Sequence, residues 1–294
     1  MSRPIPTMRV GDLVVHVLSD GFFRLDGGAM FGIVPKTLWE KKIPADEKNR
    51  ITLGLNCMLV TLPDGRRVLC DTGMGERWSE KERAIYGIDR TETLDGSLRT
   101  LGLTQADIDV VINSHLHFDH AGGNTVATPD GRIVPTFPNA TYVSQEREWT
   151  EANAPHERHR ASYRPDDFLP VVAEGQLRLA RGTEEILPGV FVDHCPGHCP
   201  GHQVVRLESK GATLVFAGDL MPTAAHVRPA WNMGYDLDAA AVVNGKRALL
   251  DKIVEGGWTI CFDHDPTTPL VRIRREVRDG REDYVTVPVG DSVS

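Results

Sequence analysis

The sequence predicts a mixed fold of the α/β or α+β class, in a single domain that spans residues 1–294. Three observations predict it. Many short runs rich in Val, Ile, Leu or Thr are bounded by Gly, Pro, Asp or Asn, as strands are. One long stretch has the spacing of an amphipathic helix. Strands and helices are mixed along the chain, and no repeat, low-complexity tract or proline-rich linker divides it.

The predicted strands occur throughout the chain. Each is a short apolar run that ends at a turn-forming residue. In order, they cover residues 13–18, 55–62, 67–70, 109–113, 141–144, 190–193, 203–207, 213–217 and 258–262.

The strongest predicted helix covers residues 238–255. Asp238 can cap its first turn, and apolar residues such as Val242, Leu249 and Ile253 recur at spacings of three and four. The pair Gly256-Gly257 ends it. Weaker helices are predicted at residues 98–101 and 144–153.

Composition and charge limit the possible partners. Lys and Arg number 33 and Asp and Glu number 41, so the formal net charge is −8, which argues against a nucleic-acid partner. Five cysteines without a C-x-x-C pair predict neither a disulfide framework nor a zinc ribbon. The N-terminus lacks the apolar core of a signal peptide, and no stretch is long enough to span a bilayer. We therefore expect a cytoplasmic protein with no membrane partner.

The segment from Ser114 to Gly123 carries the most informative motif. It follows the apolar residues 108–112 and places His115, His117, Asp119 and His120 within six positions. Such a density of ionisable groups at the end of a buried strand suits a divalent metal site better than unpaired burial. In an extended stretch His115 and His117 point the same way and can share one ion. After the chain bends, Asp119 and His120 can serve a second ion.

Three later segments place single metal-binding residue types after predicted strands. They are the turn that contains His198 and His202, the Gly218-Asp219 pair, and His264. Each segment taken singly is typical of an ordinary turn or loop.

Taken together and in this order, these segments resemble the metallo-β-lactamase superfamily, with its H-x-H-x-D-H motif followed by His, Asp and His. The resemblance implies a four-layer αββα sandwich with a dinuclear metal site at the edge of the sheets. It also implies the seven ligands. One metal would be held by His115, His117 and His198, the other by Asp119, His120 and His264, and Asp219 would bridge both. Asp71, in Cys70-Asp71-Thr72, matches a buried Asp that supports the site from behind.

The implied chemistry is hydrolysis. Two divalent ions lower the pKa of a bridging water so that hydroxide forms near neutral pH, and one ion polarises the bond under attack. Asp119 or Asp219 would then pass a proton to the leaving group as the catalytic carboxylate. Because every implied ligand offers nitrogen or oxygen, zinc is the first expectation, and cobalt, manganese or iron remain alternatives.

Within the superfamily, the chain resembles the branch of N-acyl-homoserine lactonases and methyl parathion hydrolase. A bridging Asp219 is unlike the β-lactamases. Stretches such as Glu148-Trp149 and the residues from Ala230-Trp231 to Tyr235-Asp236 resemble the lactonase-like proteins. The leading hypothesis is therefore a quorum-quenching lactonase that acts on a small ester or lactone by hydroxide attack. One departure is the absence of a tyrosine shortly after Asp219, where His226 is a candidate for the substrate contact. His202 is expected behind the metal ligands.

Two alternatives remain open. The same hydroxide could serve a phosphotriesterase or aryl esterase of the methyl parathion hydrolase type. From another class, the fold also hosts mononuclear iron sulfur oxygenases, and the chain could be a non-catalytic metal-binding scaffold. The family and the apolar N-terminal segment predict a homodimer.

Overall fold

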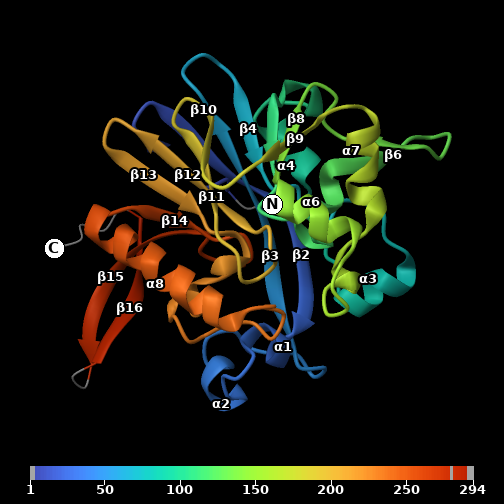
Figure 1. The fold of residues 1–294 in the computed structure, drawn as a ribbon. Helices are drawn as coiled ribbons and strands as arrows, with labels where there is room; N and C mark the ends of the chain where they lie inside the picture. Colours follow the sequence, from blue (N-terminus) through green and yellow to red (C-terminus); the bar gives the residue numbers. More distant parts are fainter. Residues whose placement is uncertain (1–3, 279–280, 290–294) are drawn as a thin grey trace.

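Two seven-stranded sheets, one from each half of the chain, form the centre of the structure (Figure 1). The computed structural model describes residues 4–278 and 281–289. The first sheet has the order β1-β2-β3-β4-β5-β8-β9, and the second has the order β10-β11-β12-β13-β14-β15-β16. The chain crosses from the first sheet to the second at residues 181–183.

Strands of the first sheet are antiparallel from β1 to β4 and parallel from β4 to β9. Their bounds are β1 (Thr7–Val10), β2 (Leu13–Asp26), β3 (Arg50–Thr61), β4 (Arg67–Cys70), β5 (Val110–Ile112), β8 (Thr141–Gln145) and β9 (Leu177–Ala180). A separate short hairpin joins β6 (Thr125–Ala127) to β7 (Ile133–Pro135).

Strands of the second sheet are antiparallel except for the parallel pair β13 and β14. Their bounds are β10 (Glu184–Leu187), β11 (Val190–His194), β12 (Gln203–Ser209), β13 (Ala212–Phe216), β14 (Thr259–Cys261), β15 (Leu270–Arg278) and β16 (Arg281–Pro288).

Helices cover the outer face of each sheet. Leu98 of α4 and Val171 of α7 pack with buried residues of the first sheet. Leu250 and Ile253 of α8 pack with buried residues of the second sheet. The bounds are α1 (Gly27–Phe31), α2 (Lys36–Trp39), α3 (Glu80–Tyr86), α4 (Leu94–Thr100), α5 (Phe118–Ala121), α6 (Glu146–Asn153), α7 (Leu169–Ala173) and α8 (Ala239–Gly256).

The main core lies between the two sheets. Val15 and Val68 of the first sheet share one buried cluster with Val205 and Phe216 of the second. Since each sheet also packs against helices on its other face, the layers alternate as helix, sheet, sheet and helix. The predicted αββα architecture is confirmed.

All nine predicted strands are present, and so are the predicted helices. Helix α8 begins after Asp238, whose side chain accepts a hydrogen bond from the Ala241 N–H, and it ends before Gly257, which has a φ of 61°. The helix predicted at residues 98–101 begins earlier, because Thr93 caps α4 through the Gly96 N–H.

Among the described residues, no helix combines the length and the apolar character that crossing a bilayer requires.

Candidate metal centre

The carboxyl ends of β4, β5, β13 and β14 meet at one edge of the two sheets. Asp71 follows β4, the H-x-H-x-D-H segment follows β5, Asp219 follows β13, and His264 follows β14 by three residues. The parallel pairs β4-β5 and β13-β14 therefore present side chains from distant parts of the chain to one place.

Close backbone packing shapes the segment after β5. A side chain on Gly123 would place its first carbon 2.2 Å from the Thr72 carbonyl oxygen, and one on Gly122 would meet the Met74 carbonyl oxygen at 2.3 Å. Only glycine fits both positions. The close approach lets α5 begin after His117, so that Asp119 and His120 lie in a helical turn rather than continuing the extended stretch.

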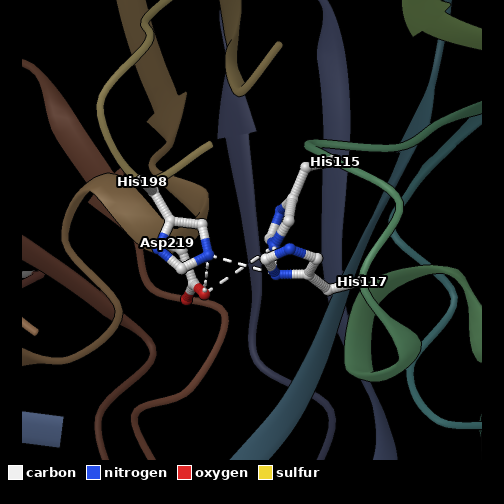
Figure 2. Close-up of side chains that lie close together, drawn as sticks. All are labelled: His115, His117, His198 and Asp219. Atoms are coloured by element: carbon white, nitrogen blue, oxygen red, sulfur yellow. Dashed lines mark hydrogen bonds and ion pairs between the residues drawn. The ribbon is translucent and has the colours of Figure 1, made fainter. Parts of the chain in front are cut away.

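Four side chains form a group that we call the first cluster: His115, His117, His198 and Asp219 (Figure 2). His117 Nδ1 lies 2.9 Å from His115 Nε2 and 3.2 Å from His198 Nε2. Asp219 Oδ2 lies 3.1 Å from His198 Nε2 and 3.8 Å from His115 Nε2.

Four side chains form the second cluster: His120, Asp219, Asp263 and His264. The Nε2 atoms of His120 and His264 are 3.1 Å apart, and Asp219 Oδ1 lies 3.4 Å from His264 Nε2. Asp119 Oδ2 is close by, at 3.5 Å from His264 Nε2 and 3.8 Å from His120 Nε2. Asp219 therefore lies between the clusters: Oδ1 faces His264, and Oδ2 faces the first cluster but also lies 3.7 Å from His120 Nε2.

These spacings fit divalent metal ions. With metal–nitrogen distances of about 2.0–2.1 Å, two ligand atoms of a tetrahedral site lie about 3.3 Å apart. In the first cluster, His117 Nδ1 lies at similar distances from the buried nitrogens of His115 and His198. Asp219 Oδ1 is buried and accepts no hydrogen bond from the described residues. The donor set and its unsatisfied atoms are therefore suited to cations.

Burial keeps two histidines of the first cluster neutral. It lowers the pKa of His115 and of His117 well below the ordinary value, which leaves each ring a lone pair for a metal. At His198 burial acts in the same direction, but the carboxylates of Asp219 and Asp236 outweigh it and raise the pKa.

Negative charge dominates around His120. Although burial favours the neutral ring, the carboxylates of Asp119, Asp71 and Asp219 raise the pKa of His120 well above its ordinary value. At Asp219, burial is outweighed by neighbouring histidines, and its pKa lies well below the ordinary value. The centre therefore holds an excess of carboxylate charge that a divalent cation would neutralise.

Carboxylates behind the rings fix the orientation of two histidines. Asp71 accepts hydrogen bonds from the Ser114 N–H at 2.7 Å and lies 2.8 Å from His120 Nδ1. Asp236 lies 3.0 Å from His198 Nδ1 in the same way. Such partners hold the ring so that its other nitrogen faces the metal.

Glu148, at the start of α6, connects the two histidine loops of the first cluster. Its carboxylate accepts hydrogen bonds from the Leu116 N–H and the Tyr163 hydroxyl, and the Cys199 thiol lies 3.0 Å from the other oxygen. A side chain on Gly201 would come within 2.0 Å of the Glu148 nitrogen. Glu148 is fully buried, so it joins the loops of His117 and His198 at a fixed distance.

A cavity of about 190 Å³ opens above both clusters. Besides cluster residues and Asp119, its lining is apolar at Leu25, Met30, Phe118, Ala161 and Met233, and polar at Tyr86, Arg158, His159, Ser162 and Tyr235. Burial raises the pKa of Tyr235 to about 12, so its hydroxyl stays protonated near neutral pH.

The two remaining candidate histidines lie outside both clusters. Burial lowers the pKa of His202 to about 3, and a side chain on Gly218 would meet its Nε2 at 2.7 Å, so His202 packs against the loop of Asp219. His226 does not line the cavity. Its ring nitrogens face Thr223 Oγ1 at 2.8 Å and the Met30 carbonyl at 2.9 Å, and the side chain is fully buried. The structure therefore does not support a substrate contact by His226.

Four buried residues of the site were not among the site residues predicted from the sequence. Glu148 and Asp236 are isolated acids, and each contacts a histidine loop that is distant in the chain. His159 donates to the Tyr235 carbonyl and packs edge-on against His117. Asp263 had one usable sign, its position directly before His264.

Comparisons with known proteins agree with this arrangement. The model of the metallo-beta-lactamase superfamily matches residues 51–285. An N-acyl homoserine lactonase from Bacillus cereus is 31% identical over 180 residues, which are 57% of this chain and 63% of that protein. The chain spans about three fifths of the length of this and the related Bacillus lactonases.

Solved structures match over more of the chain. A probable metal-dependent hydrolase from Staphylococcus aureus is 33% identical with a TM-score of 0.85, over 95% of this chain and 99% of that one. AidC, a dizinc quorum-quenching lactonase in complex with a product, has a TM-score of 0.78 over 98% of each chain. At 20% identity the second likeness is one of fold.

Proposed function

Because the chain belongs to the metallo-beta-lactamase superfamily, we propose that it is a dinuclear metal-dependent hydrolase that opens lactones, with N-acyl-homoserine lactones as the foremost substrates. The observation that carries this proposal is the pair of histidine and aspartate clusters that share Asp219 beneath one cavity. The similarity to Bacillus lactonases supports the substrate class.

The proposed ligands follow from the distances. His115, His117 and His198 would hold one ion, with Asp219 between the two sites. His120, His264 and Asp119 would hold the other. Divalent ions in these sites would supply a nucleophilic water at neutral pH and polarise the ester carbonyl.

The protein's own residues would bind the substrate and move the proton. Asp119 lines the cavity, and its carboxylate can hold a proton and deliver it to the leaving oxygen when the ring opens. The apolar lining receives the acyl chain, and the Tyr235 hydroxyl can donate a hydrogen bond to a substrate oxygen. Since the cavity is smaller than the 300–1,000 Å³ or so of many ligand pockets, we expect short acyl chains to be preferred.

The test is a substrate panel with metal analysis on the same sample. We expect two metal ions per chain and the highest kcat/KM on short-chain N-acyl-homoserine lactones. Simple lactones and an aryl phosphotriester are the comparison substrates. Faster turnover of the triester would replace the lactonase proposal with a phosphotriesterase, and weak rates across the panel would point to a different ester.

We also propose a homodimer that forms through the apolar segment around α1 and α2. Ile33 and Leu38 in this segment are 92% and 49% exposed, which is unusual for large apolar side chains placed close together. Light scattering after size exclusion should give twice the monomer mass. A double variant with Ile33→Glu and Leu38→Glu should give the mass of a single monomer.

A further inference from the structure

The buried carboxylate of Asp263 has no hydrogen-bond donor among the described residues. The residue is 2% exposed, and neither of its oxygens accepts a hydrogen bond. Oδ2 lies 3.6 Å from His264 Nε2 and 3.8 Å from His120 Nδ1. A buried carboxylate without hydrogen bonds destabilises a fold unless a cation compensates its charge.

Asp263 differs from the carboxylates that orient the rings. Asp71 and Asp236 each lie within hydrogen-bond distance of a histidine nitrogen, at 2.8 and 3.0 Å. Asp263 makes no such bond, yet one of its oxygens lies within 4.8 Å of ligand atoms from His120, Asp219 and His264. Asp263 therefore approaches the metal-facing nitrogen of His264 without holding either ring in place, which leaves its carboxylate free to bind a cation.

We propose that Asp263 is an additional ligand of the second metal site, and that it makes this site favour a harder ion than the first. The inference rests on the proposed function, since it assumes the two sites. The first site offers three imidazole nitrogens and the shared Asp219. The second offers His120 and His264 together with oxygens from Asp119, Asp219 and Asp263. Imidazole suits Zn²⁺, whereas carboxylate oxygen suits Mn²⁺, so the two positions should load unequally.

The test compares the full chain with its Asp263→Asn variant. Each protein is stripped of metal and then titrated with Zn²⁺ or Mn²⁺, and bound metal is counted by elemental analysis. Manganese at the second site is also followed by electron paramagnetic resonance. We expect the variant to keep the first site and to lose about 10- to 100-fold in Mn²⁺ affinity at the second.

Thermal unfolding supplies a readout that a structural role would not reproduce. Asp263→Asn breaks no hydrogen bond among the described residues, so the metal-free variant should have a Tm no lower than that of the metal-free wild type. The increase in Tm on adding Mn²⁺ should be smaller in the variant. A side chain needed only for packing would lower both values.

Asp236→Asn is the matched control, because it acts behind His198 of the first cluster. It should weaken the first site and spare the second. Wild-type affinities at both sites in Asp263→Asn, or a lower Tm of its metal-free form, would overturn the role of Asp263 alone. A wild-type chain that binds fewer than two ions would overturn the proposed function as well.

Discussion

Asp119 lines the cavity and lies beside both histidines of the second cluster. We expect Asp119→Ala to lower kcat/KM by about 10²–10⁴-fold, because the variant loses a proton carrier and a proposed ligand. The Tm of the metal-free protein should change little, since no hydrogen bond to Asp119 is removed among those of the described residues. Asp130→Ala, at an exposed surface turn, is the control. Full activity in Asp119→Ala would contradict the two-site mechanism.

Lys246 is a buried lysine whose ammonium group donates to the carbonyl oxygens of His226 and Trp231. Burial lowers its pKa from 10.5 to about 7. Between these values the unfolded chain binds the proton and the folded chain does not, so the free energy of unfolding should rise with pH across this window. Below about pH 7 both the folded and the unfolded chain bind the proton, so Lys246 no longer makes the free energy of unfolding depend on pH.

Lys246→Met should remove this slope between pH 7 and 10.5. It should also cost about 1–3 kcal/mol, because two buried carbonyls lose their donor. Denaturant unfolding of the metal-free protein over a pH series measures both effects. Lys252→Met, on an exposed turn of the same helix, should leave the slope unchanged.

At the scale of elements, α6 sets the spacing between the two loops that carry the first cluster. Glu148→Gln replaces an acceptor carboxylate that three groups contact, and one of its amide positions can only donate. We expect a cost of about 1–3 kcal/mol in stability and a loss of about tenfold or more in first-site metal affinity. Metal titration and denaturant unfolding test this. Glu146→Gln, whose exposed carboxylate pairs with Arg181, should change neither by much.

Prediction from the sequence worked best for elements with a local signal. The runs in β3, β4 and β13 are mostly apolar, and Asp238 and Gly257 mark both ends of α8. Strand β9 was not predicted, because only Ala180 in it is buried. Strand β15 was missed because its arginines interrupt the apolar alternation, so its pairing with β14 decides its structure.

The residues of the site also differ in whether the local sequence indicates them. The four residues of the H-x-H-x-D-H segment lie within six positions and could be recognised directly. Asp236 could not, because it is 38 residues from His198 and only the tertiary fold brings them together. The burial of Asp263 without a hydrogen bond likewise depends on strands from both sheets. Local spacing indicates the proposed ligands of one segment, whereas the contacts of Asp236 and Asp263 appear only in the fold.

At the scale of the whole molecule, metal binding should be a large part of stability. Each ion that binds only the folded chain adds about 2.7 kcal/mol at a concentration of 100 Kd. Thermal unfolding with and without a chelator should therefore show a much lower Tm for the metal-free protein. His115→Ala should reduce this difference, whereas His16→Ala, on β2 and in neither cluster, should not. Equal Tm values with and without chelator in the wild type would contradict metal binding to the folded state.

The crossing at residues 181–183 separates a part of the chain that supplies His115, His117, Asp119 and His120 from a part that supplies the other proposed ligands. Neither part alone can complete a metal site. If the chain were expressed as two pieces divided at this crossing, each piece would be inert, and the proposed hydrolysis would return only when the pieces met. If each piece were fused to one of two other proteins, the return of activity would report that those two proteins bind each other.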